Sequence, residues 1–210
     1  SVHQLLTGFA EGDAVSLAAR AMRAAFRRLG LVSEIYADPE HTSPGCVGDC
    51  LPLGEYRGEA RDIVLHHYAI ASPVADVFLA SPARKVMVYH NITPSHFFEG
   101  YSDNMVAQLS ASRARLPVVA KGADAVWADS GYNAQELSEA GVAEPLLFPL
   151  PFDPSSLDVE PDQELRRRYR EPLKNLLFVG RMAPNKCVEE LILMYAHYYF
   201  NINPHSRLIL

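Results

Sequence analysis

Short apolar runs alternate with segments of helical periodicity along most of this chain. Residues 2–7 and 33–37 are apolar runs that predict two strands, and between them apolar positions recur on one face of a helix. The opposite face of that helix carries Arg20, Arg23, Arg27 and Arg28. Gly30 is expected to end the helix because glycine readily adopts the left-handed conformation that closes helices. Strand, helix and strand within this length predict a parallel crossover unit.

The same alternation continues along the rest of the chain. Further strands are predicted at residues 62–66, 85–89, 125–128, 145–150, 175–179 and 207–210. Helices are predicted at residues 73–80, 103–121, 134–140, 165–170 and 188–200, and Pro117 is expected to kink or divide the second of these. Residues 41–59 are rich in proline and glycine and lack periodicity, so we expect a long surface loop there. The whole pattern indicates an α/β fold with a Rossmann-like parallel sheet.

The composition of the chain changes after residue 150. Prolines and acidic residues are interleaved between Pro151 and Asp162, which is typical of an interdomain linker. We therefore expect a first domain over residues 1–150, a linker over 151–173, and the first strand-helix-strand unit of a second domain over 174–210. One such unit cannot bury both faces of its sheet. The sequence thus predicts a fragment of a longer protein, or a chain whose second unit is covered by a partner.

Composition and charge narrow the class of protein. The chain is 49% hydrophobic and 21% charged with a net charge of −6, which is ordinary for a globular protein and gives no indication of binding to nucleic acid or anionic lipid. It has no apolar run of about 18 residues that would span a membrane, and its start does not resemble a signal peptide. Cys46 and Cys50 lack the spacing and the partners of a zinc site. We therefore expect free thiols, no metal and a cytoplasmic protein, unless a leader has been removed.

The clearest chemical signal is the segment FVGRMAPNK, residues 178–186, which joins a predicted strand to a predicted helix. Gly180 has no side chain and would let a ligand approach the backbone closely. Arg181 and Lys186 place two cations beside a helix N-terminus, where a pyrophosphate binds well. An exposed arginine and lysine on a loop without a ligand are an equally good interpretation of these residues alone. The chain has neither the Walker pattern nor GxGxxG, which argues against a nucleotide hydrolase and a dinucleotide enzyme.

The longer run FVGRMAPNKCVEELI, residues 178–192, resembles the sequence that opens the C-terminal domain of group-one retaining glycosyltransferases with the GT-B fold. The resemblance implies that Gly180, Arg181 and Lys186 contact the diphosphate of a nucleotide-sugar donor. Two fixed cations there would stabilise the departing nucleoside diphosphate without a metal ion. It also implies that residues 1–150 form the N-terminal, acceptor-side domain. The glutamate pair with which the family binds the donor sugar has no counterpart in this chain.

The resemblance extends to the predicted loops of the first domain. It implies that Gly12 lies near the donor phosphates and that His90 is catalytic and faces the transferred sugar, where an imidazole can exchange hydrogen bonds with hydroxyl groups. Weaker candidates for an acceptor or sugar pocket are Asp13, Asn91, Thr93 and Ser130. Asp13 and Ser130 also suit the role of helix N-cap, and a lone histidine at a strand end is often structural.

His66 and His67 occupy the end of the neighbouring predicted strand and are rivals of His90 for the same pocket. Adjacent strand residues point to opposite faces of a sheet. At most one of these two histidines is therefore expected to face the site.

These residues together predict a metal-independent retaining glycosyltransferase. It would move a sugar from a nucleoside-diphosphate sugar, its co-substrate in place of a cofactor, to a saccharide or lipid-linked acceptor. The chain by itself is expected to be inactive, because its second domain is incomplete. The alternative is a non-catalytic α/β module that binds a phosphate or nucleotide. A nucleotide-sugar epimerase ranks last, since GFAEGDA at residues 8–14 has only two glycines and lacks the dinucleotide-binding pattern.

The basic face of the first predicted helix has two interpretations. It is either a solvated surface or a surface in contact with anionic lipid headgroups.

Overall fold

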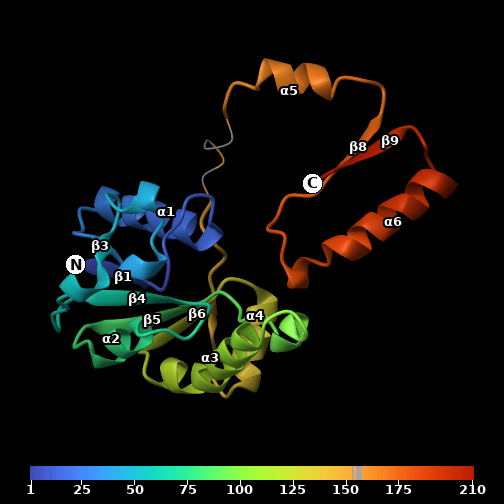
Figure 1. The fold of residues 1–210 in the computed structure, drawn as a ribbon. Coiled ribbons are helices and arrows are strands. Elements are labelled where there is room, and N and C mark those ends of the chain that lie inside the picture. Colours follow the sequence, from blue (N-terminus) through green and yellow to red (C-terminus); the bar gives the residue numbers. More distant parts are fainter. Residues whose placement is uncertain (153, 155–157) are drawn as a thin grey trace. The chain divides into compact units, whose positions relative to one another are not determined.

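The computed structural model describes residues 1–152, 154 and 158–210 (Figure 1). The chain divides into two compact units. One contains Ser1–Ser95 and Asn104–Asp153, and the other contains His96–Asp103 and Pro154–Leu210. The predicted linker over residues 151–173 includes residues 153 and 155–157, which lie outside the described part of the chain.

The first unit is built on a seven-stranded parallel sheet. Its strands are β1 (Val2–Leu6), β2 (Ile35–Ala37), β3 (Leu51–Pro52), β4 (Ile63–Tyr68), β5 (Arg84–Tyr89), β6 (Ala125–Ala128) and β7 (Leu146–Leu147). They lie in the order β3-β2-β1-β4-β5-β6-β7, and every neighbouring pair is parallel. The sheet therefore grows outwards in both directions from β1 and β4, which is the Rossmann-like arrangement. The predicted α/β class with a parallel sheet is confirmed.

Helices cover both faces of this sheet. They are α1 (Ala14–Arg28), α2 (Val74–Ala80), α3 (Asp103–Lys121) and α4 (Gly131–Glu139). Parallel crossovers are right-handed, so the reversal of direction between β1 and β4 moves the later helices to the other face. Figure 1 shows α1 on one face and α2, α3 and α4 on the opposite one. Most predicted strands and helices are present, with ends shifted by a few residues.

The central strands are buried along nearly their whole length, yet they are not wholly apolar. All five residues of β1 are buried, including His3 and Gln4, and the buried part of β4 includes His66 and His67. The apolar side chains around them pack with α1 and with the flanking strands into two clusters centred on Leu6 and Leu65. Buried polar groups must find hydrogen-bond partners. Of these four residues, Gln4 and His67 are hydrogen-bonded to each other and mark where a polar network runs through the core.

The register of the sheet brings four strand ends to one edge. Leu6 of β1 pairs with His67 of β4, Tyr68 pairs with Tyr89 of β5, and Tyr89 pairs with Ala128 of β6. The loops that leave these strands therefore start side by side. Ligands of open parallel sheets bind at this carboxyl edge, near the point where the strand order reverses.

The prediction of a long loop over residues 41–59 is wrong. This segment contains β3, which adds an edge strand to the sheet, and single 3-10 turns at Pro44–Cys46 and Leu53–Glu55. Such short elements leave no periodicity in a sequence, so a proline- and glycine-rich stretch conceals them. Cys46 is fully buried in the cluster around Leu6.

Pro117 does not divide α3, which continues from Asp103 to Lys121. Proline removes one backbone hydrogen bond from a helix interior. The residues on either side of it, Leu116 and Val119, are almost completely buried. Their packing offsets the lost bond and keeps the helix whole.

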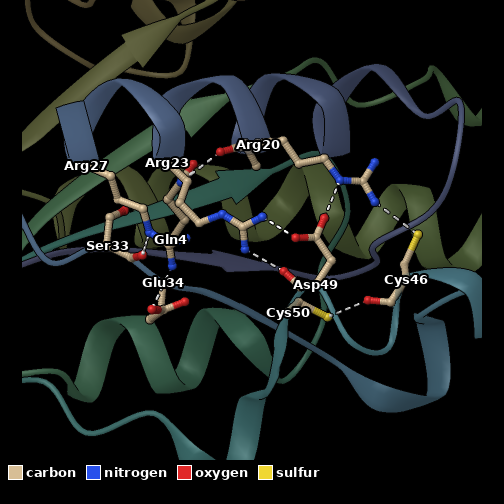
Figure 2. A network of polar contacts seen from close by, with 10 residues as sticks. Gln4, Arg20, Arg23, Arg27, Ser33, Glu34, Cys46, Asp49 and Cys50 are labelled. Carbon is tan, nitrogen blue, oxygen red and sulfur yellow. Dashed lines mark hydrogen bonds and ion pairs between the residues drawn. The ribbon is translucent and has the colours of Figure 1, made fainter.

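Three arginines on the exposed side of α1 tie the helix to later parts of the chain (Figure 2). Arg20 donates from Nε to the Asp49 carboxylate at 2.6 Å, and Arg23 donates both to that carboxylate and to the Asp49 carbonyl oxygen. Arg27 donates to the Ser33 carbonyl oxygen at 3.0 Å and to the Glu34 carboxylate at 2.7 Å. The basic face is thus largely paired within the protein, and only part of it is a solvated surface.

The electrostatics of Asp49 reflect this pairing. Partial burial alone would raise the pKa of its carboxyl group, but the hydrogen bonds and positive charges of Arg20 and Arg23 outweigh burial and lower the pKa. Arg20 also lies over the ring of Phe9, with its guanidinium carbon 4.5 Å from the ring centre. We call Arg20, Arg23 and Asp49 the α1 clamp, because they hold the segment before β3 against the helix.

The second unit contains α5 (Gln163–Arg168), β8 (Lys174–Leu177), α6 (Val188–Asn201) and β9 (Ser206–Ile209). β8 and β9 are parallel neighbours. Several large apolar side chains remain about 70% exposed, among them Leu177, Leu193 and Met194. An apolar cavity of about 520 Å³ lies between β8 and α6. Within the described residues, this strand-helix-strand unit therefore leaves much apolar surface uncovered.

We expect Asp49→Ala to lower the free energy of unfolding by about 1–2 kcal/mol, because it leaves the partly buried Arg20 and Arg23 without their carboxylate. Urea unfolding followed by circular dichroism measures this change. Glu34→Ala is the matched control, since it breaks the more exposed pair with Arg27 and should change the stability by at most about 0.5 kcal/mol. Equal effects of the two substitutions would contradict the α1 clamp.

Candidate functional site

A row of hydrogen-bonded side chains crosses the central strands just below their carboxyl ends. Gln4 in β1 donates from Nε2 to the carbonyl oxygen of Ala19 in α1 at 3.0 Å, and its Oε1 lies 2.9 Å from Nε2 of His67 in β4. Nδ1 of His67 lies 2.8 Å from Nε2 of His90. His90 follows β5 directly, so the row reaches the edge where loops begin. We call Gln4, His67 and His90 the histidine row.

The histidine row ends on an acidic residue. Nδ1 of His90 lies 3.4 Å from Oδ2 of Asp129, the residue that follows β6. The amide nitrogen of the Asn133 side chain, in α4, donates to the other carboxylate oxygen. Burial acts to raise the pKa of Asp129, but the hydrogen bond and charge of His90 and the bonds from Asn133 and Ser130 lower it. Asp129 is therefore a carboxylate at neutral pH.

The imidazole rings of His67 and His90 are hydrogen-bonded to each other and are not stacked face to face. Their planes are within 3° of parallel, and their centres are 5.0 Å apart. A nitrogen–nitrogen distance of 2.8 Å is shorter than the roughly 3.5 Å between stacked atoms, so the rings lie close to a common plane. Burial lowers the pKa of His67 well below its ordinary value, and the neighbouring imidazoles of His90 and His66 further disfavour a charge on it. His67 is therefore neutral.

His90, the predicted catalytic residue, is enclosed by the protein. Its side chain is only 2% exposed, and each ring nitrogen has a partner within the chain. A sugar hydroxyl could bond to this ring only after one of those two bonds had broken. The catalytic role of His90 remains a prediction, and the arrangement described here is that of a buried, fully bonded histidine.

His66 and His67 lie on opposite sides of the sheet, as alternation along a strand requires. His67 bonds to His90 and is its partner. His66 packs against Tyr68 and Phe78, and its Nδ1 lies 3.2 Å from the carbonyl oxygen of Leu5. Its Nε2 is buried with no hydrogen-bond partner among the residues of the described structure. Burial lowers the pKa of His66 to about 4, so this ring is neutral at physiological pH.

The loop after β5 is fixed by a second network, which sequence reasoning did not reveal. Asn91 adopts the left-handed conformation, with φ at 71°, and turns the chain so that Ile92 is buried. The amide of Ile92 donates to the Tyr89 hydroxyl at 3.1 Å, and Arg113 donates to the Ile92 carbonyl oxygen at 2.5 Å. Glu136 accepts hydrogen bonds from both Tyr89 and Arg113. Asn91 and Thr93 are half-buried in this loop.

Two of the weaker candidates act as helix caps. Asp13 accepts hydrogen bonds from the amide and the hydroxyl of Ser16, at 2.9 and 2.8 Å, at the start of α1. Ser130 accepts from the amide of Asn133, at 3.2 Å, at the start of α4. Gly12 precedes the first cap with φ at 71°, a conformation that strains other residues. Sequence reasoning offered the cap as an alternative role for both residues, and their geometry is that of a cap.

A further pair of hydroxyls joins the loops at the point where the strand order reverses. Oγ1 of Thr7, directly after β1, lies 2.8 Å from Oγ of Ser72, in the loop after β4. Neither residue was among the predicted site residues, because a single hydroxyl in a loop carries no sequence signal. Gln4 was also missed, although a polar residue inside an apolar strand is a signal that could have identified it.

The predicted phosphate-binding residues lie in the second unit. Gly180, Arg181 and Lys186 belong to the segment between β8 and α6, and all three are exposed. The N-cap position of α6 is Cys187, whose side chain caps no backbone amide. Two cations and the uncapped start of a 14-residue helix thus occur within one short segment. Glu189 and Glu190, in the first turn of α6, reduce the positive potential there.

A comparison with protein-family models gives no match, and neither does a comparison with curated proteins. Across residues 1–152, 154 and 158–210, no helix combines the length and the hydrophobicity that crossing a membrane requires. The same residues contain no group of three or more His, Cys, Asp or Glu side chains that could hold a metal ion. The three cysteines are free thiols.

The buried histidines make the fold sensitive to acid. A histidine whose pKa is lowered on folding stabilises the protein fully above its unfolded pKa of about 6.5, and that stability is lost as the pH falls. With a folded pKa of about 4, His66 should contribute a loss of about 2 kcal/mol between pH 7 and pH 5. Urea unfolding at both pH values measures it. In His66→Leu this part of the loss should vanish, whereas His96→Leu, at an exposed site, should behave like the wild type. Identical pH dependence in wild type and His66→Leu would overturn this assignment.

Proposed function

We propose that this chain belongs to a nucleotide-sugar-dependent glycosyltransferase of the GT-B type and carries its acceptor-side domain together with the start of its donor-binding domain. The observation that carries the proposal is the segment from Gly180 to Lys186. It leaves a parallel strand at the carboxyl edge, presents two exposed cations and enters a helix whose first amides have no side-chain cap. These are the features that bind a diphosphate.

The chemistry of sugar transfer suits these residues. Breaking the bond between the sugar and the diphosphate leaves additional negative charge on the nucleoside diphosphate. Arg181 and Lys186 are placed on one short loop where they can offset that charge as it develops. The resemblance to group-one enzymes gives retention of configuration as the expected stereochemical outcome. The nucleotide sugar is a co-substrate, and the acceptor is a saccharide or a lipid-linked saccharide.

The first unit would supply the acceptor side. Its carboxyl edge gathers the capped start of α1 after β1, the Asn91 turn after β5 and the capped start of α4 after β6. An edge of this kind is the usual place for ligand contacts in a parallel sheet. Three free thiols, one of them fully buried, suit the reducing environment of the cytoplasm.

A second candidate function is an α/β module that binds a phosphate or nucleotide without catalysing transfer. The enclosure of His90 favours it. With 2% of the side chain exposed and both ring nitrogens bonded, the predicted catalytic group offers no free atom to a substrate in this arrangement. The two candidate functions differ in whether the first unit binds a saccharide.

We expect the 210-residue chain to bind nucleoside diphosphates through Arg181 and Lys186, with affinity that falls as salt is added. Arg181→Ala and Lys186→Ala should each weaken binding roughly tenfold, equivalent to about 1.4 kcal/mol. Isothermal titration calorimetry with UDP, GDP and ADP measures this. Lys174→Ala is the control, because Lys174 is an exposed cation at the opposite end of the same strand. Unchanged binding in both loop variants would refute the proposed diphosphate site.

Amide chemical shifts separate the transferase from the binding module. We expect a nucleotide sugar to shift the signals of residues 180–188, and a saccharide acceptor to shift those of Gly12, Asn91 and Thr93, because a transferase also has to bind its acceptor. A binding module would show shifts only in the second unit. Incubation of the chain with a radiolabelled nucleotide sugar should give no transferred sugar, since its 210 residues hold no counterpart of the glutamate pair with which group-one enzymes bind the donor sugar. Observed transfer would contradict this expectation.

A further inference from the structure

The histidine row has a direction, which can be worked out from its inner end. The carbonyl oxygen of Ala19 can only accept a hydrogen bond, so the Gln4 amide must turn its nitrogen towards it. The Gln4 oxygen then faces His67, and because it can only accept, Nε2 of His67 must carry a proton. A backbone carbonyl thus fixes the tautomer of a histidine two residues along the row.

The next step fixes one nitrogen of His90. His67 is neutral, since it is fully buried beside two other histidines, so it has one ring proton and that proton is on Nε2. Its Nδ1 therefore carries a lone pair. The 2.8 Å bond between Nδ1 of His67 and Nε2 of His90 requires the proton to come from His90. Nε2 of His90 is a donor.

The other nitrogen of His90 faces a carboxylate. Oδ2 of Asp129 lies 3.4 Å from Nδ1 of His90, while the opposite oxygen accepts from the Asn133 amide. A neutral His90, with its one proton already on Nε2, would direct the Nδ1 lone pair at this negative charge. A proton on Nδ1 turns that repulsion into a charge-assisted hydrogen bond. Both ring nitrogens of His90 then donate, and the ring is positively charged.

We propose that Gln4, His67 and Asp129 are positioning residues that hold His90 as a buried imidazolium, donating from both ring nitrogens. His90 then acts as a fixed positive charge at the carboxyl edge of the sheet and cannot accept a proton from a ligand. The proposal concerns protons within the chain and stands independently of the proposed function. If the protein is a transferase, this arrangement assigns His90 an electrostatic role and excludes it as a general base.

The titratable groups around the row are few. Asp129 is the carboxylate in contact with His90, and His66 is the other histidine close enough to His67 to disfavour a charge on it. Arg115 acts on His66 in turn. Gln4, Ser130 and Asn133 contribute uncharged hydrogen bonds to His67 and Asp129. If His67 gained a proton, two donors would face each other, so acidification should break the bond between the imidazoles.

Nitrogen-15 NMR of the histidine side chains tests the proposal on the 210-residue chain. At pH 7 the His90 ring should show two protonated nitrogens, and the His67 ring should be the neutral form with its proton on Nε2. Exposed His96 provides a reference in the same spectrum, and His67→Gln and His90→Gln assign the two signals. A neutral His90, or a His67 with its proton on Nδ1, would overturn the proposal without any variant being needed.

Two substitutions then test the cause. Asp129→Asn should remove the second proton from His90 at pH 7, because an amide can donate to Nδ1 and no longer requires a cation. Gln4→Met is made in the Asp129→Asn background, where a neutral His90 can either donate to His67 or accept from it. Removal of the Gln4 acceptor should then leave His67 as a mixture of its two neutral tautomers, whereas Asp129→Asn alone should keep the His67 proton on Nε2. His90 that remains doubly protonated in Asp129→Asn would show that Asp129 does not hold the charge. An unchanged His67 tautomer in the double variant Asp129→Asn/Gln4→Met would show that Gln4 does not set the direction.

Discussion

The structure depends on one constraint: Gln4 and His67, two polar side chains inside the central strands, have to be hydrogen-bonded within the protein. β1 and β4 are covered by neighbouring strands and helices, so Gln4 and His67 have no access to water. Each is satisfied by the other, by the Ala19 carbonyl oxygen of α1 and by His90 beyond β5. This chain of bonds across β1, β4 and β5 adds to the backbone ladder in fixing their relative register. Specificity of pairing follows, since a slip by one residue would turn Gln4 and His67 to opposite faces.

The same constraint links the core to the edge where ligands bind. The bond from His90 to Asp129 carries the network from inside the sheet to the start of α4, where Ser130 caps the helix. On the far side of the loop, Tyr89, Arg113 and Glu136 hold the backbone of Ile92. The turn at Asn91 lies between these two networks. A left-handed non-glycine residue is tolerated when its surroundings determine its conformation in this way.

Sequence reasoning recovered the parts of the fold that depend on local pattern. The α/β class, the parallel sheet and the span of α3 follow from periodicity, and the caps at Asp13 and Ser130 follow from residue type. It missed β3 because a two-residue strand has no periodicity. It missed the α1 clamp because the residues next to Arg23 and next to Asp49 in the sequence do not indicate that these two distant side chains pair. It identified His90 but not its enclosure, since burial of a side chain at a strand end is decided by distant residues such as Gln4 and Asp129.

Both outer strands of the large sheet are only two residues long, and this has a consequence for association between copies of the protein. β3 ends the sheet with Leu51 and Pro52, and β7 ends it with Leu146 and Leu147. A strand of this length offers too few free backbone groups to recruit a strand from another molecule, and a proline on the β3 edge removes one donor more. The sheet is thereby protected from edge-to-edge aggregation on both sides. The exposed apolar residues of the β8 and β9 unit have no such protection, so self-association of this chain should begin there.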